Sequence, residues 1–313
     1  MQSIAANCVA ADPMTSALWP KKSDICAVIV TFHPDDAISE RIASIRHQVH
    51  EVLIVDNNSD RVAFNLLQRL SLEPSMHLIR NEENVGIASA LNQGVRWAIQ
   101  RGYPCALLLD QDTVPASCMV DSLIEAYEAF PRKDRLALIG SNYEDPHSHT
   151  NLPQFHPQDD RVWEERKTVI TSGTLLFLAA HERIGPFRDE FFIDCVDLEY
   201  CLRARSKGFK VIVTSKPLMI HVIGQPTQHR LPWREIGLSN HNHIRRYYMI
   251  RNHIDLVKKY ALREPAWVLA SLWRRFKSII VLSLFEEDRL AKVRYSAMGL
   301  FDGLFSKFDR KVS

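Results

Sequence analysis

The sequence predicts an α/β protein built on a doubly wound, mainly parallel sheet with a C-terminal helical extension. The first observation is a regular alternation of short apolar, β-branched runs with amphipathic patterns of helical period. The second is that polar residues follow these runs at their carboxyl ends, where such sheets bind ligands. The third is a composition of 313 residues, 46% hydrophobic and 24% charged, which is enough for one large domain with an appendage.

Four strands are expected in the first third of the chain, separated by helices. The helical patterns run from Asp36 to Val49, from Ser59 to Leu72 and from Gly86 to Ile99. The expected strands are Ile25 to Thr31, Glu51 to Asp56, Met76 to Arg80 and Ala106 to Leu109.

Further elements are expected after a long polar connection from Asn142 to Arg166. Strand character resumes from Val169 to Leu178, and the second half of the stretch from Phe191 to Gly208 is helical. A strand from Phe209 to Thr214 follows. After it, the apolar stretch from Leu218 to Val222 contains His221.

The polar clusters after the strands lie along one rim if the sheet is parallel. They are Thr31 to His33, Asp56 to Ser59, Asn84 to Gly86 and Asp110 to Asp112. The chain has neither a GxGxxG nor a GxxxxGK[ST] motif, so a nucleotide would be held in another way. A carboxylate such as Asp56 can accept from the imide N–H of uracil or thymine, which favours a pyrimidine nucleotide.

Asp110 and Asp112 stand where a buried strand ends. Residues two apart on an extended chain point the same way, so both carboxylates could face one ligand. One would reach a ribose or a water molecule and the other a divalent cation. The alternative is that Asp112 caps a helix opened by Pro115.

A second acidic pair, Asp194 and Asp197, lies at the start of the helix that ends at Gly208. Capping and interaction with the helix dipole would account for one of the two carboxylates. The segment around Ser172 and Gly173 allows a ligand close to the backbone. A lone histidine such as His221 is more often a hydrogen-bonded core residue than a ligand.

Together these clusters resemble the inverting family 2 glycosyltransferases of the GT-A fold, and specifically bacterial rhamnosyltransferases that use dTDP-rhamnose. The resemblance covers about residues 25 to 260. The matching motifs are Thr31-Phe32, Val55 to Ser59, Asn81 to Gly94, Asp110-Gln111-Asp112, Thr171 to Thr174, Phe192 to Arg203 and Arg245 to Asn252.

The resemblance implies a role for each matching position. Asp197 would be the general base, with Asp194 in reserve because the acidic residue that usually precedes the base is Val196 here. Asp112 would bind Mg²⁺ or Mn²⁺, joined by His221, which lies 24 residues after Asp197. Asp56 would bind the base and Asp110 the ribose. The other nucleotide-binding positions would be Thr31, Phe32, Asn58, Asn84, Gly86, Asn92 and Arg251, with Ser172 and Gly173 on the acceptor side. For Arg251, a solvated basic helix face is an equal alternative.

The implied reaction moves L-rhamnose from dTDP-rhamnose to a hydroxyl group of a cell-surface polysaccharide, such as an O-antigen, or of a lipid-linked glycan. It proceeds by one metal-assisted displacement that inverts the anomeric carbon. Three alternatives stay open: a transferase that uses a UDP-hexose, a sugar nucleotidyltransferase, and a catalytically dead glycan-assembly subunit. The nucleotidyltransferase would need a Gly-rich basic loop after the first strand, where Thr31-Phe32-His33-Pro34 stands. Asp112 and Asp197 both argue against the dead subunit.

The sequence divides into residues 1–22, a disordered leader; residues 23–262, the catalytic domain; and residues 263–313, an amphipathic helical tail. Within the catalytic domain, the nucleotide-binding half would end near residue 115. The tail mixes tryptophans with basic residues, so it could contact the inner membrane, pack on the domain, or pack on a second copy.

The net charge of +2 argues against nucleic acid as a partner. The six cysteines form no CxxC pair, and no apolar stretch is long enough to cross a membrane. We therefore expect a cytoplasmic protein.

Overall fold

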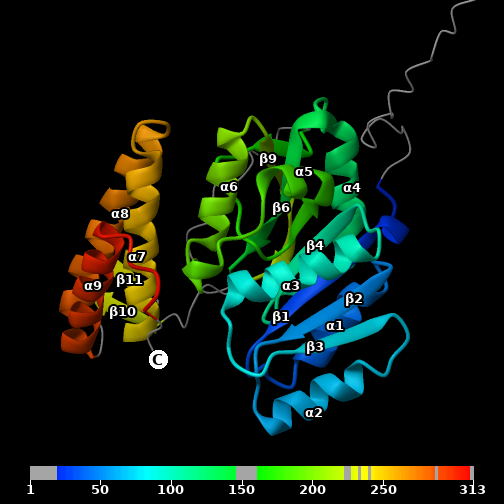
Figure 1. The fold of residues 1–313 in the computed structure, drawn as a ribbon, viewed down its shortest axis with the longest axis horizontal. Coiled ribbons are helices and arrows are strands. Elements are labelled where there is room, and N and C mark those ends of the chain that lie inside the picture. The colour runs from blue at the N-terminus through cyan, green and yellow to red at the C-terminus, as the bar shows by residue number, and fades with distance from the viewer. Residues whose placement is uncertain are drawn as a thin grey trace, which may run out of the picture.

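The computed structural model describes residues 20–145, 161–221, 227–231, 234–238, 241–285 and 288–310. Most of the predicted leader, and residues 146–160 of the predicted connection from Asn142 to Arg166, lie outside these residues. In the described part, a nine-stranded sheet with helices around it forms the α/β portion, and three C-terminal helices stand beside it (Figure 1). The predicted α/β class is therefore confirmed.

The first half of the sheet is parallel, with the strand order β3-β2-β1-β4. Its strands are β1 (Ile25–Thr31), β2 (Glu51–Asp56), β3 (Met76–Arg80) and β4 (Cys105–Asp110). Thr31 pairs with Asp56, and Val30 pairs with Asp110, so these strands end at the same rim. All four predicted strands are present.

The second half of the sheet is mixed. Strand β8 (Thr174–Phe177) runs antiparallel to β4 and joins it to β6 (Leu136–Glu144) and β9 (Lys210–Ile220). The strand predicted over Val169 to Leu178 is therefore shorter than expected, because the chain turns at Gly173 and a helix begins at Leu178.

In the described part, six helices of the α/β portion pack around the sheet, in which β1, β2, β4 and β8 are almost wholly buried. They are α1 (Ile38–Arg46), α2 (Arg61–Leu70), α3 (Ile87–Gln100), α4 (Met119–Ala129), α5 (Leu178–Ile184) and α6 (Val196–Ser206). Helix α3 lies so close to β1 that a Cβ at Gly94 would come within 2.2 Å of a Val28 methyl group. The absence of a side chain at Gly94 allows this close packing.

The helix that the alternative interpretation of Asp112 requires at Pro115 does not form. Val114 and Pro115 make a two-residue strand, β5 (Val114–Pro115), that pairs antiparallel with the end of β9. Helix α4 begins only at Met119, and its N-cap residue is Cys118, without a side-chain cap. The structure thus contradicts the interpretation of Asp112 as a helix cap.

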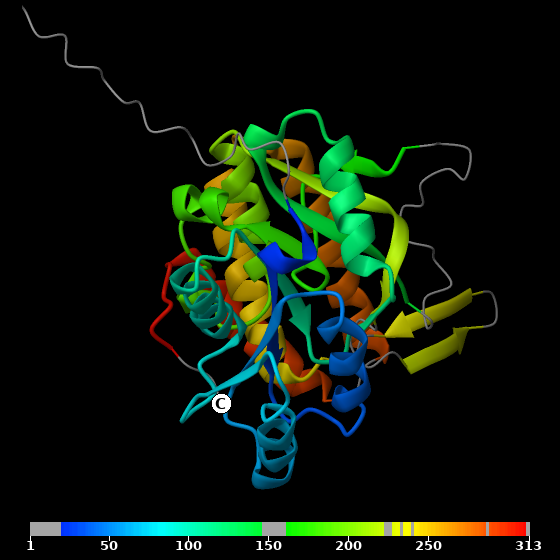
Figure 2. The ribbon, with the colours of Figure 1, turned by 90° about the vertical axis from the view of Figure 1, so that its right-hand side faces the viewer.

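The C-terminal helices are α7 (His243–Tyr260), α8 (Pro265–Phe285) and α9 (Arg289–Leu304). Helix α9 packs closely on α7, since a Cβ at Gly299 or Gly303 would overlap the carbonyl oxygens of Tyr247 or Arg251. A separate hairpin of β10 (Thr227–Leu231) and β11 (Arg234–Leu238) projects from the molecule (Figure 2). Among the described residues, every helix is too short or too polar to cross a bilayer.

Candidate active site

A cleft of about 450 Å³ opens at the carboxyl ends of β1 and β4. The end of β1, the segment after β4 and the segment that enters α6 all line it. His221, which follows β9, and Arg245 in the first turn of α7 also line it. The cleft therefore lies at the rim that the sequence predicted for ligand binding.

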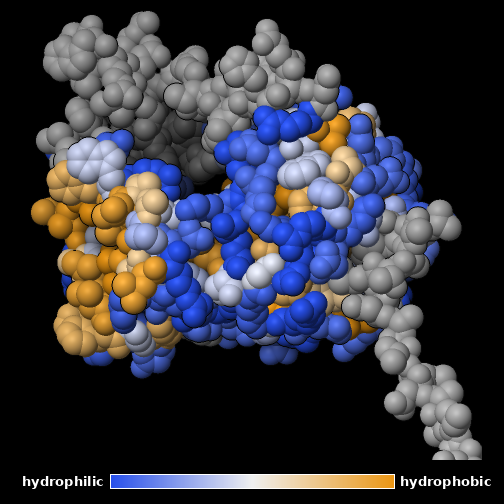
Figure 3. All heavy atoms as spheres, turned by 90° about the horizontal axis from the view of Figure 1, so that it is seen from above, coloured by the Kyte–Doolittle hydropathy of each residue, from blue (hydrophilic) through white to orange (hydrophobic). Residues whose placement is uncertain are grey.

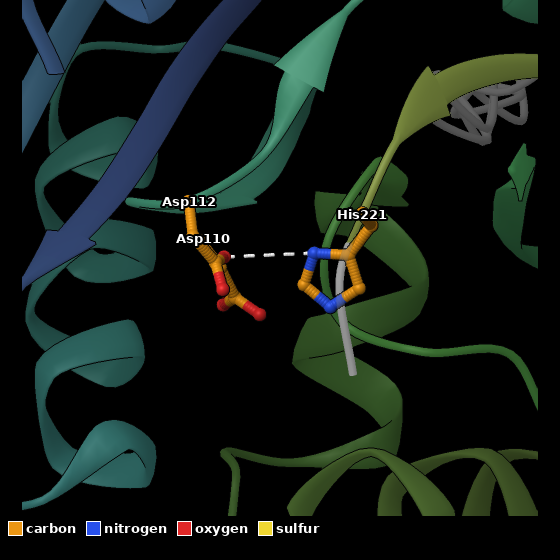
Figure 4. Close-up of side chains that lie close together, drawn as sticks. All are labelled: Asp110, Asp112 and His221. Atoms are coloured by element: carbon orange, nitrogen blue, oxygen red, sulfur yellow. Dashed lines mark ion pairs between the residues drawn. The ribbon is translucent and has the colours of Figure 1, made fainter. Parts of the chain in front are cut away.

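Three side chains in the cleft are arranged as a metal-binding group: Asp110, Asp112 and His221 (Figure 4). One ligand atom from each lies within 4.8 Å of the others, and His221 Nδ1 lies 3.5 Å from an oxygen of Asp112. Two carboxylates and an imidazole suit a divalent cation such as Mn²⁺, and the carboxylates also suit Mg²⁺.

The pairing of β5 with β9 assembles this group from distant parts of the chain. Val114 lies opposite Ile220, which sets the loop after β4 beside His221. Thr113 Oγ1 is 3.2 Å from His221 Nδ1 and also contacts Ser172. Ser172 Oγ in turn accepts a hydrogen bond from the Asp110 amide at 3.0 Å. Ser172 thus holds the acidic loop in place.

The metal-binding group favours positive charge. Burial raises the pKa of Asp110 to about 6, and the nearby carboxylate of Asp112 adds to the rise. His221 and Arg245 act in the opposite direction. A bound divalent cation would be a stronger opposing charge than either and would stabilise both carboxylates in their ionised form.

Asp197, in the first turn of α6, lines the same cleft. Its Oδ1 accepts a hydrogen bond from the Leu198 amide at 2.8 Å. Burial raises the pKa of Asp197 to about 6, and the negative charges of Asp194 and Asp110 contribute to the rise. Among the described residues, Asp197 has no cationic side chain bound to it. A carboxylate with this pKa can accept a proton near neutral pH.

Asp194 differs from Asp197 because it is bound to a cation. Arg245 donates to its two oxygens, from Nε at 3.0 Å and from Nη2 at 3.3 Å. The Asp194 side chain is 15% exposed. Both groups line the cleft, and Asp194 positions Arg245 there.

The segment that carries Asp194 has an unusual backbone. Phe192, Asp194 and Cys195 have φ angles of 59°, 64° and 62°, the left-handed region that non-glycine residues seldom adopt. The side-chain amide of Asn252 donates to the carbonyl oxygens of Phe191, Ile193 and Asp194 at 2.8 to 2.9 Å. Asn252 is fully buried and therefore holds this backbone in its strained form.

We expect Asn252→Ala to lower kcat by roughly 10- to 100-fold, because small displacements of reacting groups have effects of this size. Nucleotide affinity should change much less, since Asn252 does not line the cleft. Steady-state kinetics and calorimetric nucleotide binding would separate the two effects. The matched control is Asn65→Ala at an exposed position of α2. A lower melting temperature with an unchanged kcat would mean that Asn252 only stabilises the fold.

The structure brings nine of the predicted site residues to the cleft and leaves six outside it, within the part of the chain that it describes. The residues lining the cleft are Thr31, Phe32, Asn84, Gly86, Asp110, Asp112, Asp194, Asp197 and His221. The residues outside it are Asp56, Asn58, Asn92, Ser172, Gly173 and Arg251.

Asp56 lies behind the cleft and is fully buried. Its oxygens accept hydrogen bonds from the hydroxyl groups of Thr31 and Ser59 and from the Ser59 amide. Asn58 is an exposed turn residue with a φ of 67°. Asn92 is buried in α3, where it bonds to Asp189 and to the Phe187 backbone. Of these three residues, Asp56 bonds directly to a residue that lines the cleft, Thr31.

Arg251 is buried away from the cleft, with 1% of its surface exposed. Its guanidinium group lies 4.8 to 5.4 Å from the ring centroids of Tyr247, Tyr248 and Phe308. The structure contradicts its interpretation as part of a solvated basic face. Arg245, six residues earlier on the same helix, lines the cleft instead.

Gln111 is a further lining residue that the sequence analysis left without a role. Its side-chain oxygen accepts from the Phe32 amide at 2.7 Å, and its nitrogen donates to the Phe32 carbonyl at 3.1 Å. Phe32 is 44% exposed and is fixed by this pair at the cleft edge. The position between two aspartates was the only sequence signal for Gln111.

The fold is the GT-A fold of glycosyltransferases. Residues 26–185 match the model of glycosyl transferase family 2, and the chain belongs to this family. It is 28% identical over 249 residues to the dTDP-rhamnosyl transferase RfbF of Shigella flexneri, an alignment covering 76% of this chain and 81% of RfbF. The predicted family, fold and enzyme class are confirmed.

Two solved structures illustrate the shared fold. The mannosyltransferase PcManGT from Pyrobaculum calidifontis, in complex with GDP-Man and Mn²⁺, is 15% identical with a TM-score of 0.55. The match covers 93% of this chain and 90% of that one. GalNAc-T7 with UDP, GalNAc and Mn²⁺ is 14% identical with a TM-score of 0.59, and the match covers 91% of this chain and 57% of that one.

Proposed function

We propose that this glycosyltransferase moves L-rhamnose from dTDP-rhamnose onto a hydroxyl group of a glycan, carried on a cell-surface polysaccharide or on a lipid. The similarity to RfbF supports the donor. The observation that carries the chemistry is the cleft itself, which is lined both by the group of Asp110, Asp112 and His221 and by Asp197.

The metal-binding group would bind the diphosphate of the donor through a cation. Asp110, Asp112 and His221 would hold Mg²⁺ or Mn²⁺, which supplies positive charge beside the departing diphosphate. Arg245 is the nearby protein cation that lines the same cleft, so it can bind a phosphate oxygen. The exposed ring of Phe32 offers a surface on which the pyrimidine base can stack.

Asp197 is the proposed general base. It accepts the proton of the acceptor hydroxyl while that oxygen attacks the anomeric carbon from the face opposite the diphosphate. One carboxylate is sufficient, because a metal-bound diphosphate leaves without protonation. The displacement inverts the anomeric configuration. Asp194 is less suited to this role because it is bound to Arg245.

The donor is tested by calorimetric binding of dTDP, UDP, GDP and ADP, each with Mg²⁺, with Mn²⁺ and with EDTA. We expect dTDP to bind most tightly, and only when a divalent cation is present. Turnover of dTDP-rhamnose with an isolated glycan acceptor, and the configuration of the product, would then test the reaction. Preference for UDP would replace rhamnose with a UDP-linked hexose, and equal binding in EDTA would contradict the metal-assisted mechanism.

A further inference from the structure

Helices α8 and α9 expose a broad apolar surface on the side that faces away from the sheet. Figure 3 shows hydrophobic residues gathered at this end of the molecule, over the C-terminal helices. We define the tail face as the exposed apolar side chains Leu269, Leu272, Trp273, Phe276 and Ile279 of α8 with Leu290, Val293, Leu300, Phe301 and Leu304 of α9, together with Phe305. A contiguous apolar surface of this kind marks an interaction site.

Each helix divides into a buried side and this exposed side. On α8, Val268 and Ser271 are buried, whereas Trp273 and Phe276 are 58% and 55% exposed. On α9, Gly299 and Gly303 lie against α7, whereas Phe301 is 51% exposed. The exposed apolar side chains of the tail face are thus not buried by the described part of the chain. Contact with an apolar partner outside it would bury them.

The exposed charged residues within helices α8 and α9 are all basic. The sequence of α8 contains no Asp or Glu, and the one acidic residue of α9, Asp302, is fully buried and accepts from Tyr247. Arg274 and Lys277 follow Trp273 on α8, and Arg294 lies within the exposed side of α9. Within the described residues, these three cations have no carboxylate bound to them. Asp288, the exposed N-cap residue of α9, is the acidic residue nearest to the tail face in sequence among the described residues.

We propose that the tail face binds the surface of a bilayer that contains anionic phospholipids. Basic amphipathic helices with Trp, Phe and Leu insert their apolar side chains at the boundary between headgroups and acyl chains, and their cations bind anionic headgroups. Trp273 suits this position because an indole ring is apolar with one polar N–H. The binding is peripheral.

A second copy of the chain fits this surface less well. In a symmetric dimer a surface meets itself, so Arg294 and Lys277 would meet the same basic surface without acidic partners. Burying unpaired charges in an apolar interface is strongly unfavourable. Anionic headgroups supply the negative charge that the tail face lacks.

The helices that carry the tail face also contact elements that line the catalytic cleft. Arg275 of α8 lies 4.0 Å from the Cys195 sulfur, next to Asp194 in the cleft wall. Helix α9 packs on the part of α7 that follows Arg245. Docking through the tail face would therefore hold the cleft near the membrane surface, where an acceptor carried on a lipid would be concentrated. Binding of the tail face to a bilayer would not depend on the identity of the donor.

The test is sedimentation of the full chain with vesicles of phosphatidylcholine alone and of phosphatidylcholine mixed with phosphatidylglycerol. We expect binding to the anionic vesicles that weakens as salt is added. Lys277→Gln with Arg294→Gln should weaken it about 25-fold, at about fivefold per cation. Trp273→Ser with Phe301→Ser should weaken it about tenfold or more.

Matched controls make the same changes at exposed positions on α2 and just after it. Val62→Ser with Leu72→Ser removes two exposed apolar side chains, and Arg61→Gln with Arg69→Gln removes two exposed cations. Both control variants should bind vesicles like the wild type. Calorimetric nucleotide binding by every variant verifies an intact α/β portion.

Three results would overturn the proposal. The first is absence of binding to anionic vesicles at low salt. The second is equal binding by the tail-face variants and the wild type. The third is a dimer in sedimentation-equilibrium experiments that the Trp273→Ser, Phe301→Ser variant abolishes, without vesicle binding by the wild type. That result would assign the tail face to a second copy.

Discussion

Asp197→Asn is expected to lower kcat by about 10²- to 10⁴-fold, the range that general bases contribute. Asparagine has nearly the shape of aspartate but cannot accept the acceptor proton. Its side-chain oxygen can still accept the hydrogen bond that Leu198 donates to Asp197, so the first turn of α6 should be retained. The measurements are single-turnover kinetics with the donor and calorimetric binding of the nucleotide, which we expect to be unchanged.

Asp194→Asn is the comparison that separates the two carboxylates. It removes the negative charge that binds Arg245, so we expect weaker donor binding with a smaller loss of kcat. Retention of more than about a tenth of the wild-type kcat by Asp197→Asn would contradict its assignment as the base. A larger loss in Asp194→Asn would move the base to that residue.

The pH profile gives a second readout of the same group. Asp197 accepts a proton only when ionised, and burial raises its pKa to about 6. The kcat/KM for the acceptor should therefore fall about tenfold per pH unit below pH 6 and level off above it. The residual activity of Asp197→Asn should lack this slope.

The parallel half of the fold was predictable because its signal is local. Strands buried on both faces have continuous apolar sequences, as in Ile25–Thr31, and Gly86 marks the start of α3. Strand β5 was not predictable, because two residues carry no periodicity and their partners on β9 are about a hundred positions later. From the sequence alone, Pro115 is consequently also compatible with the opening of a helix.

The site was predictable as a rim but not side chain by side chain. Asp56 and Asp110 both end parallel strands, yet Asp56 bonds to Thr31 and Ser59 behind the cleft while Asp110 lines it. The direction of each carboxylate depends on neighbours that only the fold supplies. The same holds for the arginines of α7. The start of the helix and the residues packed on it determine which arginine reaches the cleft, and Arg245 lines the cleft whereas the expected Arg251 does not.

Asp112→Asn is expected to abolish the increase in nucleotide affinity that a divalent cation provides. The substitution removes one of two negative charges from the proposed metal site, and a neutral amide oxygen is a weaker ligand for a hard cation. The Asp112 side chain is 52% exposed, so the fold should be unaffected. Calorimetric titration of dTDP with and without Mn²⁺ measures the effect, and Asp134→Asn, an exposed acid on the surface, is the matched control.

A double-variant cycle with His221→Gln tests whether Asp112 and His221 bind the same ion. If they do, the loss in metal-dependent affinity for the double variant should be smaller than the sum of the two single losses, because the first substitution already removes most of the ion. Strictly additive losses would mean that the two residues act separately. Unchanged metal dependence in Asp112→Asn would contradict the assignment of Asp112 as a metal ligand.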